Sequence, residues 1–134
     1  MDSGSYQVLL VVDNTGDALR YQEMLRESDT SRFELTHVGR LEEVLHHLAQ
    51  SPSDVILLDL SLPEERGLDT FVRIHVEAPE TPIVILAGTE DSALALRAVR
   101  RGAQDFLVEG EFDGGSLVRS ACCAIERKRA EVRT

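Results

Sequence analysis

The chain has 134 residues, 43% of them hydrophobic, which suits one domain with a single buried core. It carries 24 acidic and 14 basic residues, and the net charge of −10 argues against a nucleic-acid-binding domain and against attraction to an anionic membrane surface. No run approaches the roughly 20 apolar residues that span a membrane, and the first seven residues lack a signal-peptide pattern. We therefore expect a cytoplasmic protein.

Short apolar runs alternate with amphipathic segments along the chain. In chain order, we expect strands at residues 8–12, 33–38, 55–59, 83–86 and 106–108. Each strand is followed by residues with helical periodicity. The predicted apolar faces of the five helices are, in order, Ala18, Leu19, Met24 and Leu25; Leu41, Val44, Leu45 and Leu48; Leu68, Phe71, Val72 and Val76; Leu94, Leu96 and Val99; and Leu117, Ala121 or Cys122, Ala124 or Ile125, and Val132.

Five successive strand–helix units predict an α/β fold, in which a doubly wound five-stranded parallel sheet is flanked by five helices. Parallel strands require crossover connections, and helices in those crossovers cover both faces of the sheet. We expect the domain to cover residues 7–126. Residues 1–6 would be a flexible N-terminus, and residues 127–134 would form a helical extension that links to a downstream domain.

Two of the apolar runs are followed by an aspartate. Asp13 comes directly after residues 8–12, and Asp59 ends the run at residues 55–58. The carboxyl ends of parallel strands meet at the sheet edge where open α/β sheets bind ligands, so we expect both carboxylates in one crevice. Clustered carboxylates are unfavourable without a cation, so this pair favours a cation or phosphoryl site.

The loop after the first strand disfavours binding of a nucleotide or a flavin. Residues 13–17 contain one glycine and two acids, whereas a dinucleotide site needs a glycine-rich turn and a flavin phosphate needs glycine and hydroxyl donors. The Gly-x-x-x-x-Gly-Lys nucleotide loop is absent from the sequence. A flavodoxin-like domain that binds another small molecule stays a weaker alternative.

Three stretches, residues 8–14, 54–63 and 102–108, resemble the receiver domain of two-component response regulators. The resemblance covers nearly the whole chain and implies the flavodoxin-like receiver fold. In that family a histidine kinase passes a phosphoryl group to an aspartate at the end of the third strand, which is Asp59 here. The family also binds Mg²⁺ through an acid after the first strand, the phosphoacceptor and a backbone carbonyl two residues later, which implies Asp13, Asp59 and the Ser61 carbonyl.

Three positions depart from the family pattern. The family usually has two acids after the first strand, and Val12 stands at the first of these positions. Ala87 replaces the Thr or Ser whose hydroxyl contacts the phosphoryl group, although Thr89 could substitute from the neighbouring loop. Glu109 replaces the lysine after the fifth strand, which reverses the charge beside the phosphoacceptor. We therefore expect phosphorylation of Asp59, and the switch that follows it, to be weakened.

The sequence leaves two roles open for Glu109. Its side chain could turn to solvent, or it could join Asp13 and Asp59 as a third ligand of a divalent ion. Mg²⁺ is the ion that the resemblance implies, and a third carboxylate would also suit Mn²⁺ or Ca²⁺. A fully working phosphoacceptor that takes its phosphate from a histidine kinase is the main alternative. In either case we expect no enzymatic activity beyond self-phosphorylation and dephosphorylation at Asp59.

The resemblance also implies partners. A histidine kinase or another signalling protein would contact this domain, and a homodimer would form through the fourth and fifth helices. Four basic side chains are available for ion pairs between the two copies: Arg97, Arg100, Arg101 and Arg119. We expect this domain to contact neither nucleic acid nor membrane.

Overall fold

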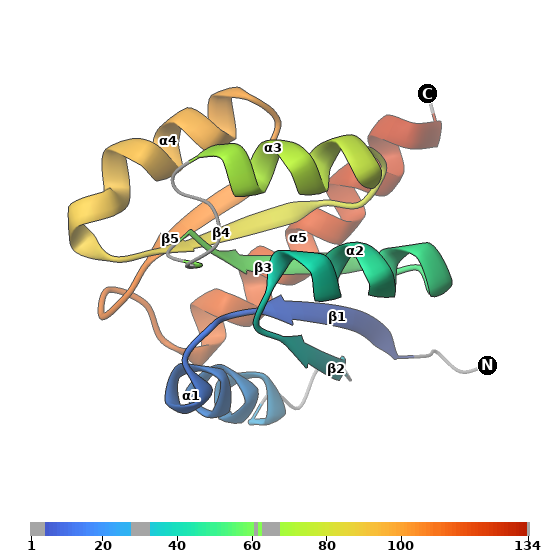
Figure 1. Ribbon diagram of the computed structural model, residues 1–134. Coiled ribbons are helices and arrows are strands. Elements are labelled where there is room, and N and C mark those ends of the chain that lie inside the picture. The colour runs from blue at the N-terminus through green and yellow to red at the C-terminus, as the bar shows by residue number, and fades with distance from the viewer. Residues whose placement is uncertain (1–4, 28–32, 61, 63–67, 134) are drawn as a thin grey trace.

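Five apolar runs form one parallel β-sheet in a computed structural model that describes residues 5–27, 33–60, 62 and 68–133 (Figure 1). The order of the strands across the sheet is β2-β1-β3-β4-β5. The strands are β1 (Tyr6–Val11), β2 (Phe33–Val38), β3 (Val55–Asp59), β4 (Ile83–Ala87) and β5 (Asp105–Val108). The five strands and their parallel pairing confirm the predicted sheet, and the predicted strand limits differ from the observed ones by two residues at most.

Helices cover both faces of this sheet. They are α1 (Thr15–Arg26), α2 (Leu41–Gln50), α3 (Leu68–Glu77), α4 (Ser92–Arg100) and α5 (Gly114–Arg133), with a short 3₁₀ turn, η1 (Thr89–Asp91), before α4. The hydrophobic cores place α1 and α5 on one face and α2, α3 and α4 on the other, which confirms the doubly wound architecture. Within the described ranges, no helix is both long and apolar enough to cross a membrane.

The central strands are apolar without interruption because both of their faces are covered. Side chains alternate between the faces of a strand. In β3, Ile56 and Leu58 pack with α2, α3 and α4, whereas Val55 and Leu57 pack with α1 and α5. This alternation decides which helices a residue at the end of a strand will meet.

Three helices bury faces that only partly match the predicted apolar faces. Leu19, Val76 and Leu96 were expected in the core but have exposed fractions of 57%, 69% and 42%. On α1 the buried face consists of Ala18, Tyr21 and Leu25, and on α3 it includes Phe71 and Ile74. On α4 the buried residues are Ala95 and Ala98, small side chains that let the helix approach the sheet closely. Val132 near the end of α5, also expected on an apolar face, is 49% exposed.

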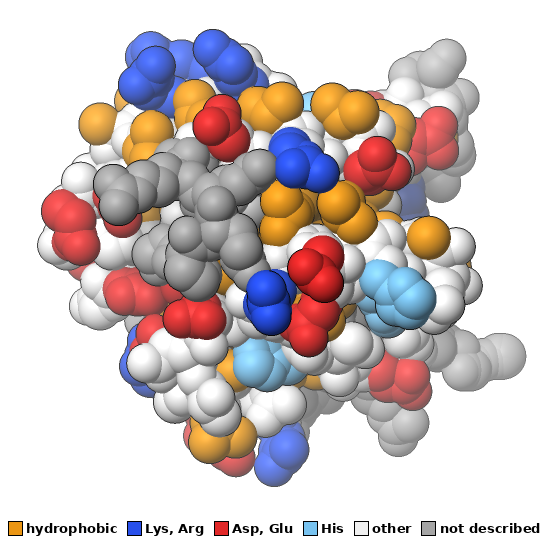
Figure 2. All heavy atoms as spheres, in the orientation of Figure 1, with side chains coloured by type: hydrophobic (Ala, Val, Ile, Leu, Met, Phe, Trp, Pro, Cys, Tyr) orange, Lys and Arg blue, Asp and Glu red, His pale blue; other side chains and the backbone are white. Residues whose placement is uncertain are grey.

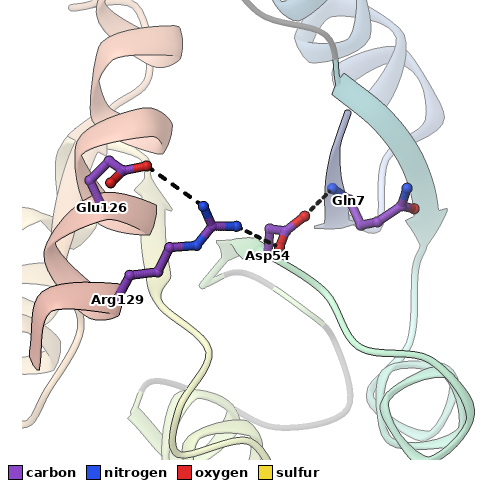
Figure 3. Close-up of polar contacts among 4 residues, drawn as sticks. All are labelled: Gln7, Asp54, Glu126 and Arg129. Carbon is purple, nitrogen blue, oxygen red and sulfur yellow. Dashed lines mark hydrogen bonds and ion pairs between the residues drawn. The ribbon is translucent and has the colours of Figure 1, made fainter. Parts of the chain in front are cut away.

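The end of α5 is joined to the amino-terminal edge of the sheet (Figure 3). Arg129 forms an ion pair with Asp54, with 3.3 Å between Nη2 and Oδ1, and lies 3.7 Å from a carboxylate oxygen of Glu126. Asp54 also accepts a hydrogen bond of 2.6 Å from the backbone N–H of Gln7. The helix therefore runs through residues 127–133, the segment expected to be a helical extension, and contacts the edge of the sheet through Arg129. Tyr6, expected before the domain, is the first residue of β1.

Candidate functional site

Asp59 is the last residue of β3 and lies at the carboxyl-terminal edge of the sheet. Its side chain is buried, with an exposed fraction of 6%. Asp59 has the same position in the strand alternation as Val55 and Leu57, so its side chain lies on the face covered by α1 and α5. The predicted phosphoacceptor position is thus next to α1.

Glu109 follows β5 directly and is held at two points. Its backbone N–H donates a hydrogen bond of 2.8 Å to the carbonyl oxygen of Ala87, which extends the sheet pairing by one residue. Its side-chain Oε2 accepts a hydrogen bond of 3.1 Å from the hydroxyl of Tyr21 on α1. The Glu109 side chain is half-buried. Of the two roles that the sequence left open, the structure therefore does not show the one in which this side chain turns out to solvent.

Three carboxylates meet at this edge of the sheet. Asp17, Asp59 and Glu109 each present one oxygen, and these three oxygens all lie within 4.8 Å of one another. Asp17 comes from the first turn of α1, and its Oδ1 lies 2.9 Å from Nη1 of Arg20 one turn further along the helix. Two carboxylates at this separation repel by about 3.5 kcal/mol at an effective dielectric constant near 20, and by less where water screens them.

The composition of this group differs from the set that the sequence predicts. Asp13 is exposed and does not belong to it, because Val12 is the residue whose side chain enters the core under α1 and α5. Ser61, whose backbone carbonyl was expected to bind the metal, lies outside the described residues. Asp17, which we did not predict, supplies the third carboxylate of the group.

The signal for Asp17 was present in the sequence as a capping pattern. Asn14 is the N-cap of α1, and its side-chain oxygen accepts a hydrogen bond of 2.9 Å from the backbone N–H of Asp17. This contact satisfies one free donor of the first turn and fixes where the helix begins. Asp17 and Tyr21 are four residues apart, so they lie on the same face of α1. Both therefore point toward the ends of β3 and β5.

Ala87 is completely buried at the end of β4. Its methyl group packs in the core on the side of α2, α3 and α4, and it carries no hydroxyl that could contact a phosphoryl group. Thr89, which the sequence suggested as a substitute, is exposed in η1, and its hydroxyl lies 3.5 Å from Oε1 of its neighbour Glu90. The structure thus gives Thr89 a local contact in a surface turn.

Basic side chains form one distinct cluster on the face shown in Figure 2, while acidic side chains are spread more widely over it. The outer edge over α4 carries basic side chains, and Arg97, Arg100 and Arg101 are all exposed there. Acidic side chains lie below and to the left of α4 in this view, toward the edge where the strands end.

A protein-family comparison matches residues 8–117 to the response regulator receiver domain. The chain is 32% identical over 129 residues to the response regulator protein PilR of Pseudomonas aeruginosa, covering 95% of this chain and 28% of PilR. It is 31% identical over 100 residues to the regulatory protein LuxO of Vibrio cholerae, covering 75% of this chain and 21% of LuxO. The chain therefore spans less than a third of the length of these curated relatives.

Solved structures show the same fold. The signal receiver domain of a LuxO repressor protein from Vibrio parahaemolyticus superposes with a TM-score of 0.82 at 26% identity, covering 96% of this chain and 95% of that one. NtrX from Brucella abortus, solved in complex with ADP, gives a TM-score of 0.86 at 23% identity and covers 97% of this chain and 29% of its own. The matched family model, the relatives and the position of Asp59 at the end of β3 lead to one conclusion. The chain belongs to the receiver-domain family of two-component response regulators.

Proposed function

We propose that this receiver domain is a signalling module in which Asp59 keeps the phosphoacceptor position while phosphorylation and switching are weakened. The observation that carries the proposal is the Glu109 carboxylate, which has an oxygen within 4.8 Å of one from Asp59. Phosphoryl transfer depends on positive charge that stabilises the transferring group. A carboxylate held beside the acceptor opposes both the transfer and the aspartyl phosphate that results.

Ala87 supports the second half of the proposal, the weakened switch. A buried hydroxyl at the end of β4 would move toward a phosphoryl group on Asp59 and carry the following loop with it. The methyl group of Ala87 is buried in the core and offers no such hydrogen bond. Even a phosphorylated Asp59 would therefore lack one of the contacts that convert phosphorylation into a change of shape.

A divalent cation would relieve the repulsion among the three carboxylates. Carboxylate oxygens are the ligands that Mg²⁺, Mn²⁺ and Ca²⁺ prefer, and Asp17, Asp59 and Glu109 bring such oxygens within reach of one ion. Arg20 already lies beside Asp17 and supplies one positive charge. The fit supports a site with Asp17 and Glu109 as ligands in addition to Asp59. The bound ion would supply the positive charge that position 109 lacks.

Phosphorylation from a small donor tests the proposal. The parent protein, Asp59→Asn, and the double variant Glu109→Lys with Ala87→Thr are each incubated with Mg²⁺ and acetyl phosphate, and bound phosphate is measured by intact mass. We expect little phosphate on the parent, none on Asp59→Asn, and several times more on the double variant. The double variant restores both the cation and the hydroxyl next to the acceptor.

The same experiment decides the main alternative, a fully working phosphoacceptor. The position of Arg20 favours this alternative, because its guanidinium lies 2.9 Å from Asp17 and so brings a cation close to the carboxylate group. Near-complete phosphorylation of the parent, absent from Asp59→Asn, would establish the alternative and end the proposal of a weakened site. A double variant no better than the parent would show that Glu109 and Ala87 are not the cause.

Partners follow from family membership and from the surface. A histidine kinase or another signalling protein would deliver the signal. Homodimerisation through α4 and α5 would use the exposed Arg97, Arg100 and Arg101 on α4, and Arg119 on α5. Relatives such as PilR are much longer than this chain, so we place the output of the signal outside these residues.

A further inference from the structure

Tyr21 is a buried residue whose polar end reaches the carboxylate group. The residue has an exposed fraction of 0%, although it lies on α1 only one turn beyond Asp17. Its ring stacks on Phe112, with 6.2 Å between ring centres and 10° between the planes, and the guanidinium of Arg20 lies 5.2 Å from the ring centre. Contacts with Phe112, Arg20 and the core thus hold the ring in one orientation.

The hydroxyl of this ring is the hydrogen-bond donor to Glu109. The distance from the Tyr21 oxygen to Oε2 of Glu109 is 3.1 Å. A phenol keeps its proton at neutral pH, so the hydroxyl is the donor and the Glu109 carboxylate is the acceptor.

Without this hydrogen bond, charge repulsion would favour movement of the Glu109 side chain away from the other two carboxylates, and the space beside it would allow that movement. The carboxylates of Asp17 and Asp59 repel it. Next to it is an open cavity of about 440 Å³, lined by Arg20, Tyr21, Met24, Glu109, Gly110 and Phe112. Gly110, the next residue, has no side chain to fill this space, and a Cβ there would meet nothing within 4 Å.

We propose that Tyr21 is a positioning residue that holds Glu109 among the carboxylates and thereby sets the affinity of this site for divalent cations. The inference rests on the metal site of the proposed function and adds a residue that touches no metal. Groups that orient a metal ligand by a hydrogen bond typically contribute 10- to 100-fold to metal affinity. The low end of that range, about 10-fold, is expected here because the site is partly open to water.

The test is a Mn²⁺ titration in which the free ion is followed by electron paramagnetic resonance. The titration compares four proteins: the parent, Tyr21→Phe, Glu109→Gln and the double variant that combines these two substitutions. Phenylalanine keeps the stacked ring and removes only the hydroxyl, and circular dichroism confirms the fold of each variant. Tyr6→Phe is the matched control, because Tyr6 lies at the start of β1 and packs against Phe33 in a tilted arrangement, away from the carboxylate group.

We expect Tyr21→Phe to weaken Mn²⁺ binding about 10-fold and Tyr6→Phe to leave it unchanged. In the Glu109→Gln background, removal of the Tyr21 hydroxyl should have no further effect, because the charged ligand that it orients is gone. A purely structural role for Tyr21 would instead weaken binding equally in both backgrounds.

Two results would overturn the inference alone while the parent binds Mn²⁺. One is a Tyr21→Phe variant with the parent's affinity, and the other is an equal loss with and without the Glu109 carboxylate. If the parent itself binds no Mn²⁺, the proposed metal site fails and the role of Tyr21 fails with it. The outcomes therefore separate an error about Tyr21 from an error about the site.

Discussion

The carboxylates at the two edges of the sheet have different surroundings. At the amino-terminal edge, the Asp54 carboxylate contacts the guanidinium of Arg129 and the backbone N–H of Gln7 (Figure 3). At the carboxyl-terminal edge, the carboxylates of Asp59 and Glu109 have oxygens within 4.8 Å of each other and of one from Asp17. The Asp54 carboxylate thus faces an opposite charge at one edge, whereas at the other edge three carboxylates lie close together with Arg20 beside Asp17.

This difference separates residues that hold the fold together from residues that are arranged for a ligand. An acid that accepts hydrogen bonds and faces a cation contributes to the stability of the protein by itself. Three acids held together lower that stability unless a cation joins them. The cost is tolerated at the edge where open α/β sheets bind their ligands.

Removal of the Asp54 carboxylate should have the largest effect on stability. We expect Asp54→Ala to lower the free energy of unfolding by about 1–2 kcal/mol, because the Arg129 guanidinium and the Gln7 N–H both lose their partner. Urea denaturation measures this change. Glu80→Ala is the matched control at the same edge, where the side chain is exposed, and it should stay within about 0.5 kcal/mol of the parent. Equal changes in the free energy of unfolding for Asp54→Ala and Glu80→Ala would show that the Asp54 contacts do not stabilise this edge.

Neutralisation of Glu109 should change stability in the opposite direction. In the presence of a chelator, Glu109→Gln is expected to raise the free energy of unfolding by about 1 kcal/mol, because repulsion from Asp17 and Asp59 is relieved. The glutamine oxygen can still accept the hydrogen bond from Tyr21. Glu111→Gln, which removes an exposed charge two residues further along, is the control and should have little effect. A loss of stability in Glu109→Gln would mean that the carboxylate is held favourably without metal.

The smallest expected effect is a dependence of stability on pH, through His75 near the end of α3. His75, in the last turn of α3, stacks on Phe71 with 5.3 Å between ring centres. Burial, and then the positive charge of Lys128, lower the pKa of His75 below its ordinary value of 6.5. Below pH 6.5 the unfolded chain therefore binds a proton that the folded chain does not, so stability is lost as the pH falls toward the folded pKa.

Urea midpoints measured from pH 7.5 down to 5.5 test this effect. The midpoint should fall with pH, and it should fall less in His75→Gln than in the parent. His46→Gln, which alters an exposed histidine on α2, should follow the parent. Identical pH profiles for His75→Gln and the parent would show that His75 does not contribute.

Residues at strand ends could be placed from the sequence because the strands were unambiguous. Asp59 ends a strand that is buried on both faces, Glu109 directly follows the half-buried β5, and parallel strands bring such residues to one edge. The resemblance to receiver domains predicted that these two carboxylates would be neighbours. It could not show which way Glu109 points, since that depends on a hydroxyl from another element.

Residues on α1 were missed because the rotation of a helix about its axis depends on packing. Ala18 and Leu25 were expected on the core face of α1 and are buried there, but Leu19 was expected with them and is exposed, and Tyr21 was not expected. Because Tyr21 was not assigned to the core face, Asp17, one turn before it, was missed. A tyrosine in the core brings a hydroxyl with it, and here the hydroxyl reaches the site.

The helix α5 gives these two edges a mechanical connection. It begins at Gly114, five positions after Glu109, and its first turn is capped by Asp113, whose Oδ1 accepts a hydrogen bond of 2.8 Å from the Ser116 N–H. Arg129, which is bound to Asp54, lies about 22 Å further along the helix axis at 1.5 Å per residue. The helix is thus held by a side-chain contact near each of its ends. A displacement of the loop beside Glu109 would push or pull on the opposite side of the domain and strain the Arg129–Asp54 contact there.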